Sequence, residues 1–325
     1  MIKKTLALGI VAGLGLGGCA SVEINPADLN NKMQLPVSAA NPAPSGAVTS
    51  KVVIFEPDTT RATVAEQSEA GGPIQFALDG YINDAGADLV DRNLAAQLKD
   101  EVIRAEMGGA GAYQGAPVAD YAVRTTVTGA SFGAEFQEAS RWTDDDGETH
   151  VTPAKCKYSS RVAVSVDVYT VPELTRVKSL RSEGTSSASE DARSSNCNKG
   201  GPGLVRSAAE DAVYEIQEDL KAFFSPIGYV LHGFETSDGK FVLKTSLTKE
   251  LGAQEGKGVR IVNVTEEGDR YPVGEGTIAK PLVNSGAFVI VDEEVVSRVR
   301  IGDEVRVDHS CSFMGCKLDQ TLGMN

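Results

Sequence analysis

The stretch RVAVSVDVYTVPELTRVKSLRSEG, from Arg161 to Gly184, decides how the longest part of this chain is predicted to fold. In its first half a valine occupies every second position: Val162, Val164, Val166 and Val168. A period of two is typical of a strand with one buried face. VPEL (171–174) then predicts a turn, and the residues after it predict a returning strand. The stretch therefore predicts a β-hairpin.

Strands and helices alternate on the N-terminal side of this hairpin. KVVIF (51–55) is a continuous apolar run that predicts a buried strand, and DLV (88–90) predicts a brief one. A helix is expected between them, because apolar residues recur at helical spacing after Pro73, and a second helix is expected over NLAAQLKDEVIRAE (93–106). A further strand shows apolar or β-branched residues at every second position: Tyr121, Val123, Thr125 and Val127.

A long helix is predicted after the hairpin, from Pro202 to Ser225-Pro226. Its apolar stripe consists of Leu204, Ala208, Ala212, Val213, Ile216, Leu220 and Phe223. The resulting order β-α-β-α-β-β-β-α predicts an α/β sandwich with a mixed sheet over residues 51–226, in the α+β or α/β class.

Residues 227–325 have a different character. YVLHGFETSDGKFVLKTS (229–246) contains two runs typical of strands around Asp238-Gly239, which is a strong hairpin signal. Further short strands are predicted in GVRIVNV (258–264), GEGTIAK (274–280), GAFVIVD (286–292) and DEVRVD (303–308). Several short strands at regular spacing predict a small all-β barrel.

Residues 1–18 have the layout of a secretory signal peptide. Lysines precede an apolar stretch, Leu6 to Gly18, that is too short to span a bilayer. Leu16-Gly17-Gly18-Cys19 resembles the lipobox of bacterial lipoproteins, in which the cysteine is lipidated and becomes the first residue. This resemblance implies acyl chains on Cys19, and Ala20 and Ser21 imply the periplasmic face of the outer membrane. The alternative is an ordinary cleaved signal with an incidental cysteine.

Residues 19–50 are predicted to form a lipidated, flexible tether. They are rich in Asn, Ala, Pro and Ser, including PVSAANPAPSG (36–46), and they show no sustained periodicity. No later apolar run reaches the length of about 18 residues that a membrane helix needs. We therefore expect the rest of the chain to be soluble apart from its lipid.

The remaining cysteines, Cys156, Cys197, Cys311 and Cys316, predict two disulfides, because an even number in an oxidising compartment usually pairs. Three connectivities are open. We favour Cys156 with Cys197 and Cys311 with Cys316, since each pair lies within one predicted domain and the first would close the open end of the hairpin. A zinc site is less favoured, because no CxxC occurs and the chain has only 3 histidines.

We predict no catalytic, cofactor or metal site. The formal charge of −14 falls by two, to −16, once Lys3 and Lys4 leave, and this acidity argues against a nucleic-acid partner. The chain has no phosphate-binding loop after its signal and no G-x-S-x-G context. DDDGETH (144–150) lacks the ligand spacing of an EF-hand loop, so a solvated acidic loop is favoured over a calcium site. We expect a protein that is not an enzyme.

Two family resemblances cover roughly residues 48–310. KVVIFEPD (51–58), the first helix and DLVDRNLAAQLKDE (88–101) follow the order of elements of the CsgG-like family of outer-membrane lipoproteins. GAQEGKGVRIVNV (252–264) with VRIGDEVRV (299–307) resembles the SH3-like barrel of flagellar assembly protein T. The first resemblance implies a homo-oligomer that assembles through edge strands or surfaces.

The chain departs from the CsgG-like pattern at two segments that in a pore would become membrane hairpins. Glu135–Cys156 is acidic, and Ser182–Gly203 has hardly any apolar residue. A charged side chain on a lipid-facing strand costs about 2 to 4 kcal/mol at the bilayer midplane. The sequence therefore argues against a pore of this kind.

These observations predict a lipid-anchored, non-enzymatic assembly or scaffold protein of the outer membrane. It would bind other envelope proteins and help to build a surface structure of appendage, flagellar or adhesin type. Two alternatives stay open: an oligomeric secretion channel of the curli-transport type, and a lipoprotein regulator of a periplasmic cell-wall enzyme.

Overall fold

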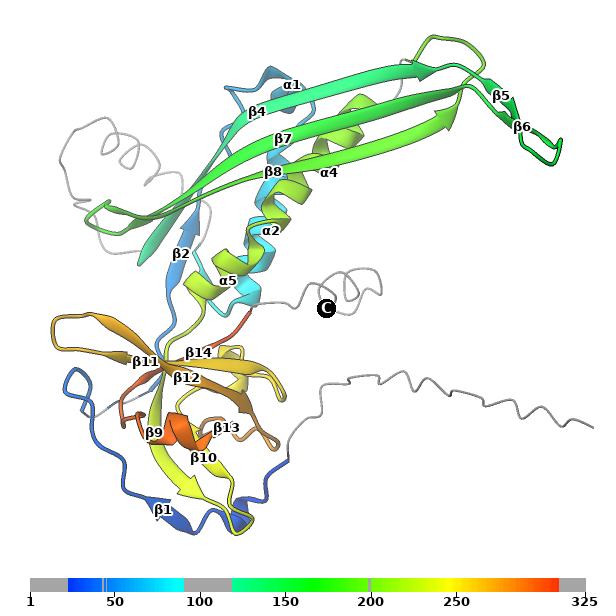
Figure 1. The fold of residues 1–325 in the computed structure, drawn as a ribbon. Helices are drawn as coiled ribbons and strands as arrows, with labels where there is room; N and C mark the ends of the chain where they lie inside the picture. Colours follow the sequence, from blue (N-terminus) through cyan, green and yellow to red (C-terminus); the bar gives the residue numbers. More distant parts are fainter. Residues whose placement is uncertain (1–22, 43, 45, 91–118, 198–199, 310–325) are drawn as a thin grey trace, which may run out of the picture.

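The structure is a computed structural model that describes residues 23–42, 44, 46–90, 119–197 and 200–309 (Figure 1). It has a mixed α/β unit with a five-stranded sheet and, next to it, an antiparallel barrel. Among the described residues, no helix has both the length and the apolar character needed to cross a membrane.

The sheet of the α/β unit has the strand order β3-β2-β4-β7-β8. Its strands are β2 (Lys51–Ile54), β3 (Asp88–Leu89), β4 (Tyr121–Gln137), β7 (Lys155–Thr170) and β8 (Arg176–Asp191). β2 is parallel to β3 and β4, whereas β7 is antiparallel to both β4 and β8. The mixed sheet and the hairpin predicted from the sequence are therefore confirmed. The helix expected at 93–106 lies outside the described residues.

Four of the described helices cover one face of this sheet. They are α1 (Thr63–Gln67), α2 (Gly71–Asp84), α4 (Gly201–Tyr214) and α5 (Gln217–Phe224). The alternating valines of β4 and β7 face them, and Val123, Val127 and Val164 lie in the same buried cluster as Leu78 and Ala208. Burial of this apolar surface is what holds the unit together.

The long helix predicted after the hairpin is in fact two. α4 ends at Tyr214, and Ile216, with φ −110° and ψ 6°, is not helical. This break rotates the apolar stripe of the second helix, so that Phe224 is fully buried while Phe223 lies at the edge. Both rings contact Tyr121, with centroids 5.3 and 5.9 Å from its ring.

The second unit is a closed barrel of six antiparallel strands. They are β9 (Gly228–Glu235), β10 (Phe241–Thr245), β11 (Gly258–Val264), β12 (Arg270–Ile278), β13 (Phe288–Val291) and β14 (Glu304–Val307). The order runs β9-β10-β13-β12-β11-β14, and the pairing of β14 with β9 closes the ring. Two short helices, η2 (Lys249–Leu251) and α6 (Glu293–Val296), connect strands. The small barrel is confirmed, and its SH3-like character stays a prediction.

Residues 23–50 correct one prediction. Over its described part, this segment lies against the barrel and does not behave as a flexible tether. Its η1 turn (Pro26–Asp28) and β1 strand (Asn31–Met33) lie at one end of the barrel, and β1 pairs with β9 (Figure 1). Ile24 is only 5% exposed. The prediction missed that a few apolar residues in a polar segment are enough to dock it. We call residues 23–50 the strap.

The two units meet where the chain passes between them. Val48 and Ile227 exchange two backbone hydrogen bonds, of 2.9 and 3.0 Å. A Cβ added at Gly86, before β3, would lie 3.0 Å from the Pro226 ring. The junction therefore combines backbone pairing with close packing.

Candidate functional site: a three-stranded arm and its tip

The feature that stands out is an arm that projects from the α/β unit (Figure 1). β4, β7 and β8 are 17, 16 and 16 residues long, whereas β2 spans only 4. The arm consists of residues 128–137, 155–163 and 183–191 of these strands. Its tip, residues 138–154, carries the short hairpin β5 (Ser140–Thr143) and β6 (Thr149–Thr152).

A close contact between helix and sheet fixes the base of the arm. Gly184 of β8 lies against α4, and a Cβ there would overlap the backbone of Ala208 and Ala212. Next to it, the Ser182 hydroxyl donates to the Ala212 carbonyl, and the Thr185 amide donates to Asp211 Oδ2 at 2.8 Å. Any side chain larger than that of glycine at position 184 would push α4 off the sheet.

One face of the arm is covered. Phe132 and Tyr158 lie across β4 and β7 with ring centroids 6.3 Å apart, and the Tyr158 hydroxyl donates to Glu190 at 2.9 Å. Cys156 is 2% exposed and forms a disulfide with Cys197, which follows the end of β8. The structure thus contains the disulfide that the sequence analysis favours, although at the outer end of the arm.

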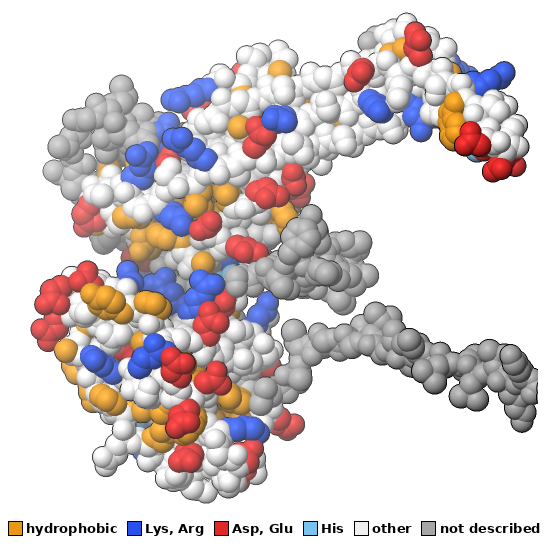
Figure 2. Space-filling view, viewed as in Figure 1, with side chains coloured by type: hydrophobic (Ala, Val, Ile, Leu, Met, Phe, Trp, Pro, Cys, Tyr) orange, Lys and Arg blue, Asp and Glu red, His pale blue; other side chains and the backbone are white. Residues whose placement is uncertain are grey.

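The opposite face of the arm is polar and open. Two shallow hollows of about 380 and 650 Å³ lie along it and share Gly133, Ser159 and Ser187. Lys157 stands between Glu135 and Ser189 in the register, and Arg161 forms an ion pair of 3.0 Å with Glu183. Figure 2 shows this part of the molecule as mostly neutral and polar, with scattered charges.

Both edges of the arm lack a strand partner among the described residues. β8 is the last strand of its sheet over its whole length, and β2 pairs with β4 only at residues 121–123. The backbone amide of Thr185 bonds to Asp211 of α4, so it points outward, away from β7. Because the pattern alternates, Ser187 and Ser189 point theirs outward too.

The tip places an aromatic pair beside carboxylates. Trp142 of β5 stacks on His150 of β6, with centroids 4.3 Å apart and planes inclined by 20°. His150 Nε2 lies 2.6 Å from Asp144 Oδ2, and this hydrogen bond lowers the pKa of the Asp144 carboxyl below its ordinary value. Trp142 is 55% exposed and Val151 is 60% exposed, so the tip presents apolar as well as charged surface.

Asp144, Glu148 and His150 each offer a ligand atom within 4.8 Å of the others. One imidazole nitrogen with two carboxylates would suit a transition metal better than calcium, which takes six to eight oxygens. The same side chains also account for an ordinary hairpin turn, because Asp144 accepts the Glu148 amide at 2.8 Å. The preference for a solvated acidic loop stays a prediction.

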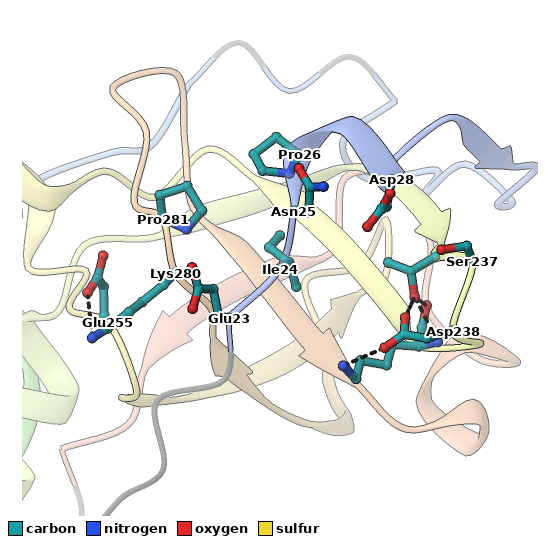
Figure 3. Close-up of a pocket in the computed structure, with 12 residues that line it drawn as sticks. Glu23, Ile24, Asn25, Pro26, Asp28, Ser237, Asp238, Glu255, Lys280 and Pro281 are labelled. Carbon is teal, nitrogen blue, oxygen red and sulfur yellow. Dashed lines mark hydrogen bonds and ion pairs between the residues drawn. The ribbon is translucent and has the colours of Figure 1, made fainter.

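A hollow of about 720 Å³ lies beside the strap on the barrel (Figure 3). The turn between β9 and β10 and residues Lys280 and Pro281 form its other walls. Two of its carboxylates have cationic partners: Asp238 pairs with Lys240 at 2.6 Å and Glu255 with Lys280 at 3.6 Å. The hollow is open and bears charge on all sides.

The other residues singled out by sequence lie apart from the arm. Cys19, Cys311 and Cys316 are outside the described residues, so lipidation and the second disulfide stay predictions. His232 lies on β9, where burial lowers its pKa, and His309 follows β14, where burial lowers its pKa to about 4. The three histidines therefore form no common site.

The sequence analysis missed two features that the fold depends on. Gly184 appeared only as the end of a predicted strand, although the small residues Ala208, Ala209 and Ala212 on the facing helix are a signal for a close contact. The strap has a weaker signal: Met33, Leu35 and Val37 alternate with polar residues and Pro36. A run this short does not distinguish a docked strand from a linker.

Comparisons with known proteins give a partial likeness. No protein-family model matches the chain, and no curated protein matches it. A neuraminyllactose-binding hemagglutinin homologue from Helicobacter pylori shares 12% identity with a TM-score of 0.35, over 61% of this chain and 92% of its own. The PelC dodecamer from Paraburkholderia phytofirmans shares 16% identity with a TM-score of 0.24, over 57% and 96%.

A third structure, lipoprotein GNA1162 from Neisseria meningitidis, shares 13% identity with a TM-score of 0.19, over 51% of this chain and 99% of its own. At these identities and TM-scores the likeness assigns no function. They assign no family either, so membership of the CsgG-like family stays a prediction.

Proposed function

We propose that this protein is a lipid-anchored, non-enzymatic assembly component of the bacterial outer membrane, and that copies join through the arm. The observation that carries the proposal is the pair of long edges, on β8 and on the outer half of β4, that have no strand partner among the described residues. Anchoring would come from acyl chains on Cys19.

An open strand edge is a template for another strand, because its outward amides and carbonyls have no partner in the sheet. The 16 residues of β8 span about 50 Å at the usual rise per residue. Natural proteins protect such edges with prolines, bulges or short strands. β8 contains no proline, and beyond its bulge near Arg176 it runs in regular register to Asp191.

The strand that pairs with the open edge of β8 would come from another copy of this chain. β4 and β8 both run away from the body, so the β8 edge of one copy and the outer β4 edge of the next would pair as parallel strands. Such a contact uses two different surfaces of each copy and repeats around a ring when the rotation closes. Side chains on the open face suit this arrangement, since they are small or polar.

The exposed face of the arm favours this assembly in water over a membrane channel. Glu135, Lys157 and Arg161 lie on it. Each charge on a lipid-facing strand would cost about 2 to 4 kcal/mol at the midplane. The acidic tip would also have to cross the bilayer.

The anchor is tested by replacing Cys19 with serine. The variant is expected to move from the membrane fraction to the soluble periplasmic fraction, whereas the wild type stays with the membrane. A wild-type N-terminus without acyl chains in mass spectrometry would refute the anchor.

The assembly is tested at Ser189 of β8. Ser189→Pro removes an outward amide without removing a bond to β7, so the monomer should fold while self-association is lost. Ser189→Ala keeps the amide and is the matched control. Crosslinking in the native envelope and the mass of the detergent-extracted protein give the result. Association that survives Ser189→Pro, or a monomeric wild type in both measurements, would rule out this edge as the contact.

A further inference from the structure

The strap leaves almost no slack between the predicted lipid site and the barrel. The Ile24 amide donates to the Lys280 carbonyl at 2.9 Å, and Glu23 bridges the same residue. The Ile24 side chain lies in a buried cluster with Val242, Ala279 and Phe288. The chain is therefore fixed to the barrel from Glu23 onward.

Further along, the strap is held at three more places. β1 pairs with β9 from Asn31 to Met33. The Ser38 amide donates to the Ile301 carbonyl, and the Ile301 amide donates to the Pro36 carbonyl, both at 2.8 Å. Val48 then pairs with Ile227. Because these contacts lie along the whole strap, pulling at its start would load the barrel and would not simply extend a linker.

Four Cα–Cα steps separate Cys19 from Glu23, and a chain of this length reaches at most about 15 Å. We infer that the barrel end bearing Glu23 faces the membrane and stays within this distance of it, while the tip of the arm is the part farthest from the membrane. This inference rests on the lipid anchor proposed above. In this arrangement the barrel is held close to the membrane, whereas a long flexible tether would let the folded body move away from it.

The partner of this barrel end is the headgroup layer, and the contact is one of proximity without insertion. The surface carries Glu23, Asp28 and Asp238 with Lys240 and Lys280 (Figure 3). Among the described residues, no cation pairs with Glu23 or Asp28. Charged side chains of this density oppose burial in lipid, and their net negative sign opposes anionic headgroups. The short chain alone therefore keeps the barrel close.

The arm projects from the α/β unit, whereas the start of the strap and β1 lie on the barrel, away from the arm (Figure 1). Its edges and tip are thus held away from the bilayer, where neighbouring copies or partners can reach them. The anchor sets the orientation of the molecule as well as its location.

The test uses the full lipidated chain in vesicles of phosphatidylethanolamine with a minority of phosphatidylglycerol. A coumarin amino acid is encoded either at Asp28, beside the strap, or at Val151, in the tip. The vesicles carry rhodamine on their headgroups as the energy acceptor. We expect most of the coumarin emission at position 28 to be lost and most of that at position 151 to remain. Equal losses, or a larger loss at 151, would overturn the inference.

A longer tether provides the second arm of the experiment. An insert of about 20 glycines and serines between Val22 and Glu23 adds a root-mean-square length of about 25 Å. Emission at position 28 should then recover, and a loss as large as before would mean that the barrel binds lipid by itself, contrary to the inference. Cys19→Ser should not bind the vesicles. A wild type that does not bind either refutes the anchor, whereas a bound wild type with the wrong order of losses refutes the orientation alone.

Discussion

The barrel and the arm are built from the same kind of strand but end differently. Each of the six barrel strands has a neighbour on both sides, because β14 pairs with β9. Among the strands that the structure describes in the arm, β7 has two neighbours, whereas β4 and β8 each have one. Closure removes edges, whereas an open ribbon keeps them available. The difference supports the proposal that the arm, and not the barrel, is the part that binds.

The two regions also differ in what holds them. The barrel encloses an apolar cluster that includes Leu243, Leu247 and Ile261, all fully buried. The outer arm has few such residues and depends on the Cys156–Cys197 disulfide and on the contact at Gly184. Changes at these positions should therefore affect the arm and spare the barrel, in the order given below.

The largest effect is expected from removing the disulfide with Cys156→Ser and Cys197→Ser together. A bridge over 41 residues contributes up to about 4 kcal/mol to the free energy of unfolding by the chain-entropy estimate. Thermal unfolding of the α/β unit and hydrogen exchange of peptides from 128–137 and 183–191 measure the loss. Exchange in the barrel strands should not change. Equal acceleration in the barrel would contradict the separation of the two regions.

A smaller loss is expected from Gly184→Ala. Overpacking typically costs about 1 to 3 kcal/mol, and this site belongs at the upper end because the new Cβ would meet backbone atoms of α4. Urea unfolding followed by circular dichroism gives the free energy of unfolding.

Gly133→Ala is the matched control for this substitution. It lies on the outer arm, where a Cβ would be 3.6 Å from the Ser159 hydroxyl, an ordinary contact. Its effect should stay within about 0.5 kcal/mol. If both alanines cost the same, the close contact at Gly184 does not fix the base of the arm.

The last effect concerns pH at the junction of the two regions. Burial, with smaller contributions from Lys221 and Lys257, lowers the pKa of His309 from its ordinary 6.5 to about 4, although Asp308 and Asp84 act in the opposite direction. The unfolded chain then binds a proton that the folded protein does not. The stabilisation is complete above about pH 6.5, falls as the pH drops toward 4, and levels off below that.

His309→Gln removes this titration. The melting temperature of the wild type should fall more steeply between pH 6.5 and 4 than that of the variant. Parallel curves would show that His309 does not couple the junction to pH.

Features that depend on local sequence patterns could be predicted, whereas features that depend on contacts between distant residues could not. The alternating valines from Val162 to Val168 predict both the strand and the face of it that meets the helices, because a period of two places all four valines on the same face. The Asp238-Gly239 pair also predicts the β9–β10 hairpin, because Asp-Gly favours the tight turn that joins two antiparallel strands. By contrast, no glycine or proline in the sequence marks the break in the helix at Ile216. The break depends on how α5 packs against the rest of the unit.

The arm could be predicted only in part. The number of cysteines and the position of the hairpin indicated the pair Cys156–Cys197. The length of the arm could not be predicted, because it depends on how its strands pair, and a polar sequence specifies that register only weakly. The residues from Ser182 to Asp191 look like a loop by composition, although they continue β8. The strap was missed because its partners are distant: Asn31 and Glu235, which form a side-chain hydrogen bond of 3.4 Å, are 204 positions apart.

This pairing of β1 with β9 has a consequence for biogenesis. The strap and the barrel strands that it packs on come from the beginning and the end of the described chain, with the α/β unit between them, so synthesis produces the strap long before its partner strands. Until the last third of the chain has been made, Ile24 and β1 have no barrel to dock on. Contacts of such high sequence separation form slowly, and the strap, although synthesised first, is therefore among the last segments to reach its native place.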